Sequence, residues 1–385
     1  MIAYNVQPLA QEKLTGIGNY ANDVLKNLLP NQKEYELHVF DFLSRNGAPD
    51  IVRTHLGDSI VDNHLMTVKG IPLSVYIRMG KAGRVIPYEK LTGTSSDVTI
   101  FFNYLAPEGL KGKSIITIYD MVCKRYPETM DNRNRKLLQR HLDASARNAS
   151  AIVTISEFSK REIMEYLDVP EEKIFVANCG IDTSFYSPLT DDTKVILEKE
   201  YLTSKWDVKD YILYVGTLEP RKNTVVLIEA FEKLCKNNPD LKLVLAGGIG
   251  WSADKTLSRI ENSEFKDRII KTGYISNEEK RMLLRNARVF VFPSIYEGFG
   301  MPVTEAMACG TPCVVANTSS LPEISMGNNL LVEPNDVDGY VKAIEFYLNN
   351  PLSIESRNRL IDTASAFSWK KAASVYEIAT KYALR

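Results

Sequence analysis

The sequence predicts an α/β protein in which two doubly wound, Rossmann-like domains follow one another along the chain. Three observations support this fold class. The chain has 385 residues, which is more than one hydrophobic core usually organises. Short apolar runs rich in Val and Ile alternate with helical stretches, a pattern typical of parallel strands covered by helices on both faces. The alternation stops near residue 187 and then starts again, so we expect a domain on each side of that break.

The first domain is expected over residues 1–187. Its predicted strands are the apolar runs at 35–40, 98–102, 114–119, 151–155 and 173–177. The next stretch, SPLTDDTKVILEKEYLTSKWDVKD at 187–210, is polar and contains no convincing strand. We therefore interpret it as the connector between the domains.

The second domain is expected over residues 188–367. Its predicted strands are the runs at 211–216, 241–247, 268–273, 288–294, 312–316 and 329–334. The last stretch, 368–385, has helical periodicity and no strand after it, so it must bury its apolar face on a domain that is already built. We expect this helix to return to the first domain and complete it.

Composition and charge exclude several function classes. The 47 basic and 48 acidic residues give a formal net charge of −1, so we expect no general attraction to nucleic acid. The N-terminal sequence MIAYNVQPLAQEKL lacks the pattern of a signal peptide. No run of about 18 apolar residues occurs, so no membrane span is expected. Together these features predict a cytoplasmic protein.

The sequence also offers no convincing metal site. Cys309 and Cys313 bracket a Gly-Thr-Pro turn, but no second pair of Cys or His follows at zinc spacing. The Asp336-Val337-Asp338 string precedes a predicted helix and is interpreted as a helix cap. We expect no metal and no cofactor, and we expect all the cysteines to be buried thiols. These are Cys123, Cys179, Cys235, Cys309 and Cys313.

Three loops carry residues suited to a ligand, and the first is LTGIGNYANDVLKNLL. Open α/β sheets bind ligands at the carboxyl ends of their strands, where such loops lie. Gly16 and Gly18 precede a helix expected to begin near Asn19, and unpaired amides at a helix start suit an anion. The alternative is a tight turn, because the third glycine of a dinucleotide-binding motif is missing.

The second loop is YVGTLEPRKNTVVLIEAF, in which a strand ends at Gly216 and a helix is expected to begin near Lys222. Arg221 and Lys222 would then lie at a helix N-terminus, where basic side chains are unfavourable unless an anion compensates them. A guanidinium and an ammonium converging there suit a diphosphate. The alternative is a pair of solvated surface charges.

The third loop lies in YEGFGMPVTEAMACGTP, where Glu297 and Glu305 flank the start of a helix. Each ionised carboxylate accepts hydrogen bonds from two directions, so one could bind the diol of a ribose and the other the hydroxyls of a sugar. Phe299, Gly300 and Met301 can direct backbone amides at an anion or at hydroxyl oxygens. A helix-dipole role for the acids is the alternative, and it accounts poorly for the EGFG turn.

These motifs together resemble a known family. The stretch PSIYEGFGMPVTEAMACGTPCVVANTSSLPE is similar to the E-x7-E signature of family 4 retaining glycosyltransferases, and LTGIGNY, GTLEPRKN and ISEFSKREI resemble its other signatures in the same order. The resemblance covers nearly the whole chain. It implies the GT-B fold, in which two Rossmann-like domains face each other across a cleft. It also implies transfer of a glycosyl unit from a nucleotide sugar, with retention at the anomeric carbon and without a metal.

The resemblance also implies roles for single residues. Glu305 would bind the nucleotide ribose and Glu297 the donor sugar, while Arg221 and Lys222 would bind the diphosphate. The amides of Gly16 and Gly18 would assist across the cleft, as would the turn before Pro302. The base would rest on the backbone near Tyr274 and Ile275, in the sequence TGYIS. The predicted donor-binding residues are Gly16, Gly18, Gly216, Arg221, Lys222, Tyr274, Ile275, Glu297, Phe299, Gly300, Met301 and Glu305.

The chain departs from the family pattern at two positions. Family members often carry Arg where this chain has Asn19, and many have His-Asp where it has Tyr119-Asp120. None of the histidines lies in a matched motif; they are His38, His55, His64 and His141. Asp120, at the end of an apolar strand, is the candidate for contact with the acceptor hydroxyl or the transferring sugar. Its alternative role is a turn or helix cap.

The expected mechanism is mainly electrostatic. In a retaining reaction of this type the departing phosphate oxygen can itself take the proton of the acceptor hydroxyl, and Arg221 and Lys222 would stabilise the charge that grows on it. A nucleophilic role for Glu297 would need a partner acid that the sequence does not show. The predicted catalytic residues are therefore Glu297, Asp120, Arg221 and Lys222.

The donor and the acceptor are the least defined expectations. The resemblance favours mannose from GDP-mannose, with UDP-hexoses and dTDP-rhamnose as alternatives, and a glycan or lipid-linked saccharide acceptor in cell-surface polysaccharide synthesis. Residues 74–91, with Arg78, Lys81, Arg84 and Lys90, would suit a peripheral contact with the inner face of a membrane, or form a solvated loop. The non-enzymatic alternative is a nucleotide-sugar-binding subunit. A glycan phosphorylase would need a lysine-bound pyridoxal phosphate, and a dehydrogenase would need a complete G-x-G-x-x-G motif.

Overall fold

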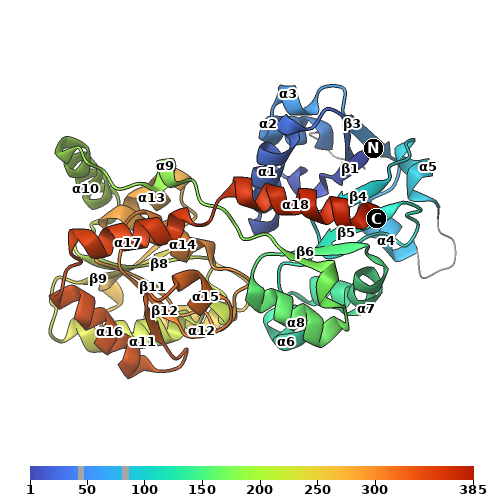
Figure 1. The fold of residues 1–385 in the computed structure, drawn as a ribbon. Coiled ribbons are helices and arrows are strands. Elements are labelled where there is room, and N and C mark those ends of the chain that lie inside the picture. The colour runs from blue at the N-terminus through green and yellow to red at the C-terminus, as the bar shows by residue number, and fades with distance from the viewer. Residues whose placement is uncertain (42–46, 80–85) are drawn as a thin grey trace. The chain divides into compact units, whose positions relative to one another are not determined.

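The structure is a computed structural model that describes residues 1–41, 47–79 and 86–385. The chain forms two compact units. Unit 1 comprises Met1–Gly180 and Ser368–Arg385, and unit 2 comprises Ile181–Phe367. Each unit contains a parallel sheet and its covering helices (Figure 1). The division falls shortly before the stretch 187–210 that the sequence suggested as a connector.

Unit 1 contains a seven-stranded parallel sheet in its described part, with the strand order β3-β2-β1-β4-β5-β6-β7. The strands are β1 (Ile2–Asn5), β2 (Tyr35–Asp41), β3 (Leu65–Lys69), β4 (Val98–Phe101), β5 (Lys113–Thr117), β6 (Ala151–Thr154) and β7 (Ile174–Val176). All five apolar runs predicted in this region form strands. The sequence reasoning missed β1, which is only four residues long, and β3, in which Val68 alone is buried.

The helices of unit 1 include one from the far end of the sequence. They are α1 (Gly16–Leu28), α2 (Ala48–Leu56), α3 (Asp58–Val61), α4 (Leu73–Met79), α5 (Tyr88–Thr92), α6 (Val122–Arg125), α7 (Asn132–Asn148), α8 (Glu157–Leu167) and α18 (Trp369–Leu384). The last of these, α18, packs against α1, β5 and β6 (Figure 1). Its Tyr376 is fully buried, with the hydroxyl oxygen 2.8 Å from Oγ1 of Thr117. The predicted return of the C-terminal helix is therefore confirmed.

Unit 2, every residue of which is described, contains a six-stranded parallel sheet with the order β10-β9-β8-β11-β12-β13. The strands are β8 (Tyr211–Val215), β9 (Lys242–Ala246), β10 (Ile269–Gly273), β11 (Val289–Phe292), β12 (Cys313–Ala316) and β13 (Leu330–Val332). All six predicted runs form strands, because each contains a short apolar segment and lies between helices. The order corresponds to that of a doubly wound Rossmann sheet, so the predicted fold class is confirmed.

The helices of unit 2 include one, α10, that the sequence did not predict to be helical. They are α9 (Thr183–Tyr186), α10 (Asp192–Trp206), α11 (Thr224–Cys235), α12 (Asp254–Glu261), α13 (Asn277–Asn286), α14 (Met301–Ala308), α15 (Leu321–Ser325), α16 (Val337–Asn349) and α17 (Ile354–Ser365). Most of the stretch 187–210 is thus helix α10. Among its residues only Leu202 is buried, and Ile196 and Leu197 are exposed. Because no apolar stripe faces a core, the stretch looks like a polar connector in the sequence.

Two expectations about the whole chain can be compared with the structure. All five cysteines are buried and free, as predicted. Burial raises the pKa of the Cys123 thiol to about 12. In the described part of the chain, no helix is both long enough and apolar enough to cross a membrane.

Candidate donor-binding site

The candidate site lies where the strand order of unit 2 reverses. β8 pairs with β9 on one side and with β11 on the other. Ligands of doubly wound sheets bind at the carboxyl ends of the strands that flank such a reversal. β8 leads into the loop that carries Arg221 and Lys222, and β11 leads into the loop that carries Glu297. The topology therefore brings together residues that are far apart in the sequence.

The loop after β8 is fixed by hydrogen bonds to the segments that follow β11 and β13. Arg221 and Lys222 lie in a single 3₁₀ turn, and α11 begins at Thr224, slightly later than predicted. Between them, Asn223 adopts a left-handed conformation with φ of 53°. Its side-chain amide donates to the carbonyl oxygens of Pro293 at 3.2 Å and Pro334 at 2.7 Å. Asn223, which the sequence reasoning missed, thus holds the basic pair beside the glutamate loop.

Glu297 is held by both basic side chains. Nζ of Lys222 donates to its Oε1 at 2.6 Å, and Nη1 of Arg221 donates to its Oε2 at 3.3 Å. Arg221 also donates to the carbonyl oxygen of Tyr296 at 2.7 Å and to Oε1 of Glu219 at 2.9 Å. Glu297 is 7% exposed. The anion that compensates the basic pair in this structure is therefore a carboxylate of the protein itself.

Charge and burial act in opposite directions on the pKa of Glu297. Burial alone would raise the pKa of this carboxyl, but the Lys222 ammonium and the Arg221 guanidinium outweigh burial, so the pKa is lowered. For Lys222, burial lowers the pKa of the ammonium, against the effect of the Glu297 charge. The ionised Glu297 is an acceptor whose two oxygens are both bound to cations.

The turn between the two glutamates depends on Gly300. Gly300 precedes α14 with φ of 108°, a conformation that favours glycine. A Cβ atom there would lie 2.7 Å from Cδ2 of Leu321. Oγ of Ser320 donates to the carbonyl oxygens of Glu297 at 3.0 Å and Phe299 at 2.7 Å. α14 begins at Met301, so that Pro302 is its second residue, and Gly310 follows shortly after its end with a positive φ.

Glu305 lies on α14 in a second cluster of buried groups. Nζ of Lys280 donates to its Oε1 at 2.6 Å, and the hydroxyl of Tyr186 donates to the same oxygen at 2.9 Å. Oε2 of Glu305 is buried and accepts no hydrogen bond from any residue that the structure describes. The sequence reasoning missed Lys280 and Tyr186. The available signal was the need of a buried carboxylate for a cation nearby.

The remaining predicted residues of unit 2 lie at the carboxyl ends of its strands. Gly216 directly follows β8. Tyr274 and Ile275 lie between β10 and α13, and the Tyr274 side chain is 74% exposed. α13 begins with a capping box in which Ser276 and Glu279 exchange hydrogen bonds. The capping box gives the loop of Tyr274 and Ile275 a fixed end.

Gly16 and Gly18 belong to unit 1, in the first turn of α1. The helix begins at Gly16, earlier than the predicted start near Asn19. The amide of Gly18 donates to Oγ1 of Thr15 at 3.4 Å. A Cβ atom at Gly18 would lie 2.9 Å from the carbonyl oxygen of Pro8, so close packing explains this glycine without a ligand.

Asp120 and Tyr119 also belong to unit 1, and both are engaged within it. Oδ1 of Asp120 accepts hydrogen bonds from the Tyr104 hydroxyl at 3.1 Å and from the amide of Val122 at 3.2 Å. Asp120 therefore caps the turn before α6, which was the alternative interpretation of this residue. The Tyr119 side chain is buried, and its hydroxyl donates to the carbonyl oxygen of Phe102 at 3.3 Å.

Neither aspartate of the Asp336-Val337-Asp338 string is placed as a metal ligand. Asp336 caps α16 by accepting a hydrogen bond from the amide of Gly339 at 2.9 Å. Asp338 forms an ion pair with Lys233 at 2.6 Å. Over residues 1–41, 47–79 and 86–385, no group of three or more His, Cys, Asp or Glu side chains is placed to hold a metal ion.

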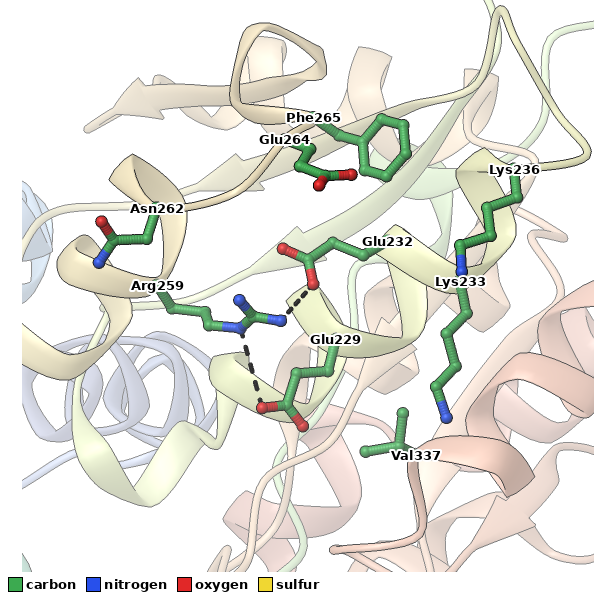
Figure 2. Close-up of a pocket in the computed structure, with 9 residues that line it drawn as sticks. All are labelled: Glu229, Glu232, Lys233, Lys236, Arg259, Asn262, Glu264, Phe265 and Val337. Carbon is green, nitrogen blue, oxygen red and sulfur yellow. Dashed lines mark hydrogen bonds and ion pairs between the residues drawn. The ribbon is translucent and has the colours of Figure 1, made fainter.

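A separate pocket of about 490 Å³ lies beside the second half of α11. Figure 2 shows Arg259 on α12 reaching toward two carboxylates of α11, Glu229 and Glu232. The pocket is lined by Glu229, Glu232, Lys233, Lys236, Arg259, Asn262, Glu264, Phe265 and Val337. None of the predicted donor-binding residues is among them. Arg221 and Lys222 precede the opposite end of α11, so this pocket is not the candidate donor site.

Known proteins similar to this chain can now be compared with it. The family described as Glycosyl transferases group 1 matches residues 203–367, and Glycosyltransferase Family 4 matches residues 94–185. The chain is 29% identical over 387 residues to the O-antigen chain mannosyltransferase B of Escherichia coli, with 97% of each chain covered. It is 28% identical over 235 residues to the serotype-specific mannosyltransferase WbdA of Escherichia coli, covering 60% of this chain and 28% of that protein.

Solved structures show the same architecture. Alr3699/HepE of Anabaena, crystallised in complex with UDP and glucose, superposes with a TM-score of 0.70 at 15% sequence identity. The alignment covers 99% of this chain and 98% of that one, so the likeness extends over both units and shows a shared GT-B fold. The matches to Glycosyl transferases group 1 over residues 203–367 and to Glycosyltransferase Family 4 over residues 94–185 make the chain similar to the family 4 glycosyltransferases.

Proposed function

We propose that the protein is a retaining glycosyltransferase that moves a hexosyl unit, with mannose from GDP-mannose as the first choice, to a glycan or lipid-linked saccharide acceptor in cell-surface polysaccharide synthesis. The similarity to an O-antigen chain mannosyltransferase over 97% of both chains supports the sugar and the setting. The complex of HepE with UDP and glucose supports a nucleotide-sugar donor. UDP-hexoses and dTDP-rhamnose are the alternative donors.

The observation that carries the proposal is the cluster of Arg221, Lys222 and Glu297 at the carboxyl ends of β8 and β11. Two cations and one carboxylate are held there, partly buried, at the reversal point of the sheet. A nucleotide sugar presents a diphosphate next to a ring of hydroxyls. Cations match the first part of this ligand and a carboxylate matches the second.

In the proposed reaction the basic pair exchanges its partner. When the donor binds, Arg221 and Lys222 turn from Glu297 to the diphosphate, and Glu297 accepts hydrogen bonds from the sugar hydroxyls. During transfer the bond between the anomeric carbon and the phosphate oxygen breaks, and the acceptor oxygen bonds to that carbon. The acceptor proton passes to the departing phosphate oxygen, whose growing charge Arg221 and Lys222 stabilise.

The other predicted residues keep supporting roles in this proposal. Glu305 binds the ribose, the backbone near Tyr274 and Ile275 supports the base, and the amides of Phe299, Gly300 and Met301 face the ligand. Gly216 leaves room beside β8. From unit 1 we propose that Gly16 and Gly18 assist the diphosphate and that Asp120 contacts the acceptor.

A screen of nucleotide sugars and their diphosphates by thermal shift tests the donor, because a ligand that binds the folded state raises its apparent stability. We expect GDP and GDP-mannose to give the largest shifts. Acceptor-dependent release of the diphosphate then tests transfer. Donor binding without any acceptor-dependent release would instead favour a nucleotide-sugar-binding subunit.

The proposal includes independence from metal ions, because the charge on the leaving diphosphate is assigned to Arg221 and Lys222. We expect EDTA to leave the rate of transfer within about twofold of the untreated enzyme, since the electrostatic stabilisation comes from fixed side chains. The measurement is diphosphate release before and after chelation. Loss of activity that manganese or magnesium restores would contradict the proposal.

For the acceptor side we propose a peripheral contact of residues 74–91 with the inner face of a membrane. Arg78 lies on α4 and Lys90 on α5, whereas Lys81 and Arg84 lie outside the described residues. Basic residues are attracted to anionic lipid by about 1 kcal/mol each near the surface. Co-sedimentation with vesicles of anionic and of neutral lipid tests this contact, and equal binding to both would exclude it.

A further inference from the structure

Glu305 is held in an asymmetric way by its two neighbours. The Lys280 ammonium and the Tyr186 hydroxyl both donate to Oε1, at 2.6 Å and 2.9 Å, and the ammonium also lies 5.5 Å from the centre of the Tyr186 ring. The other oxygen, Oε2, is buried and accepts no hydrogen bond within the described chain. A buried charged oxygen without a donor is costly, so a hydroxyl donor from a bound ligand would stabilise this atom.

The two donors are fixed by their own surroundings. Lys280 lies in the first turn of α13, which the capping box of Ser276 and Glu279 closes. Tyr186 ends α9, and this short helix is clamped to α13. The guanidinium of Arg281 lies 4.4 Å from the centre of the Phe185 ring, and Arg285 donates to the Phe185 carbonyl oxygen at 3.1 Å. Neither donor to Glu305 can therefore move far without disturbing the contact between α9 and α13.

The protonation state of the tyrosine agrees with a donor role. Burial raises the pKa of the Tyr186 hydroxyl, and the neighbouring charge of Glu305 raises it further. The hydroxyl therefore keeps its proton and donates a hydrogen bond to the carboxylate. Two donors on one oxygen fix the rotation of the carboxylate, which leaves the second oxygen in a defined direction. Such preorganisation avoids an ordering cost when a ligand binds.

We propose that Tyr186 and Lys280 are positioning residues that orient Glu305 toward the two hydroxyls of a nucleotide ribose, and so make the site prefer a ribonucleotide to a nucleotide without those hydroxyls. The inference rests on the proposed function, in which Glu305 binds the ribose. It adds that the preference depends on two residues that need not touch the ligand. Lys280 and Tyr186 then affect only the part of the affinity that comes from the hydroxyls.

Calorimetric titration with GDP and with 2′,3′-dideoxy-GDP tests the proposal, and the UDP pair serves if the donor screen selects uridine. The ratio of the two affinities measures the contribution of the ribose hydroxyls. We expect a ratio of about tenfold or more in the unmodified protein, as for hydrogen bonds to a charged acceptor. In Lys280→Met and in Tyr186→Phe the ratio falls toward one, while the affinity for the dideoxynucleotide stays unchanged. Lys280→Arg, which keeps a donor, retains most of the ratio.

A second cluster on α13 provides matched controls. Tyr201 and Lys205 both donate to Glu279, in the same combination of residue types, on the exposed side where α10 meets α13. Tyr201→Phe and Lys205→Met should leave the affinity ratio unchanged. They show what the loss of a tyrosine or a lysine from such a cluster does to the structure alone.

Each other outcome overturns a different statement. Variants at Lys280 and Tyr186 that keep the full ratio would refute the positioning role. An equal loss of affinity for both nucleotides would also refute it, because Lys280 would then contact the phosphates or support the fold in general. If the unmodified protein itself did not distinguish the two nucleotides, the ribose assignment of Glu305 in the proposed function would fail.

Discussion

The two glutamates of the segment YEGFGMPVTEAMACGTP, Glu297 and Glu305, are built into the protein in different ways. Both oxygens of Glu297 are bound by cations, Lys222 at 2.6 Å and Arg221 at 3.3 Å. Only one oxygen of Glu305 is bound, and it accepts from both Lys280 and Tyr186. Glu297 must therefore give up its present hydrogen bonds before it can accept one from a ligand. Glu305 is already oriented, and one of its oxygens can accept a hydrogen bond without losing another. Four experiments can break or sharpen this contrast.

The largest effect is expected at Glu297. Glu297→Gln should lower acceptor-dependent release of the diphosphate by about 100-fold, because a sugar held in the wrong orientation reacts slowly even when its nucleotide is bound. The same variant should bind the free diphosphate at least as tightly as the unmodified protein, since Arg221 and Lys222 lose their competing carboxylate. Calorimetry and a release assay measure the two effects. Full activity of this variant would remove Glu297 from the site.

The next effect is expected for the basic pair. Arg221→Ala and Lys222→Ala should each lower the affinity for the free nucleoside diphosphate and for the intact donor by about 10-fold to 100-fold, which is the range for the loss of charged hydrogen bonds. Lys233→Ala is the matched control, because Lys233 forms an exposed ion pair with Asp338 away from the loop. Calorimetry on all three variants decides the point. Unchanged affinity for the diphosphate in the first two would exclude them from the phosphate contacts.

A smaller effect is expected at Glu305. Glu305→Gln should lower the affinity for the diphosphate and for the intact donor alike, by about tenfold, because the ribose is present in both ligands. Glu297→Gln should differ, because it should not lower the affinity for the free diphosphate. Titration of both variants with both ligands compares the two glutamates directly. Equal losses of diphosphate affinity in the two variants would contradict the assignment of Glu305 to the ribose and of Glu297 to the sugar.

The smallest effect concerns Glu279, whose cluster on α13 resembles that of Glu305 but is exposed. The hydrogen bond from Lys205, then that from the Ser276 amide, lowers the pKa of Glu279 to about 2. Because this pKa is below the unfolded value of about 4.3, the stabilisation is complete above about pH 5 and is lost as the pH falls toward 2. Glu279→Gln should reduce the free energy of unfolding at pH 7 by about 1 kcal/mol or less, as for other exposed pairs.

Urea unfolding at pH 7 and at pH 3 measures this effect. The difference between Glu279→Gln and the unmodified protein should shrink at pH 3, because there the Glu279 carboxylate of the unfolded chain takes up a proton while that of the folded protein is still largely ionised. Glu278→Gln, one position earlier on the same helix, is the control. A difference that stayed constant between the two pH values would show that the charge of Glu279 is not the cause.

Most of the fold could be predicted from the sequence, because short local patterns identify most of its strands and helices. Most strands of unit 2, such as β8, β11 and β12, are apolar runs that can be recognised in the sequence without knowledge of their neighbours. The exceptions lack such a pattern. β1 is four residues long, β3 buries only Val68, and α10 buries only Leu202. Their positions are set by contacts with the rest of the unit, which no short window of sequence contains.

For the candidate site, the sequence identified residues but not their partners. Arg221, Lys222 and Glu297 were each predicted as ligand contacts, yet their mutual pairing depends on β8 lying next to β11, which is a property of the whole sheet. Lys280 and Tyr186 belong to no motif, and in the sequence Lys280 looks like one of many charged residues on a surface helix. Only the burial of Glu305 shows that this lysine is needed.

The return of α18 to unit 1 has a consequence for the order of events at the ribosome. Residues of unit 2 emerge from the exit tunnel before α18 does, because they precede it in the chain. A nascent chain that has just released Phe367 can complete unit 2, while in unit 1 the surface of α1, β5 and β6 that α18 covers is still open. The half of the protein that is synthesised first is thus the half that finishes folding last.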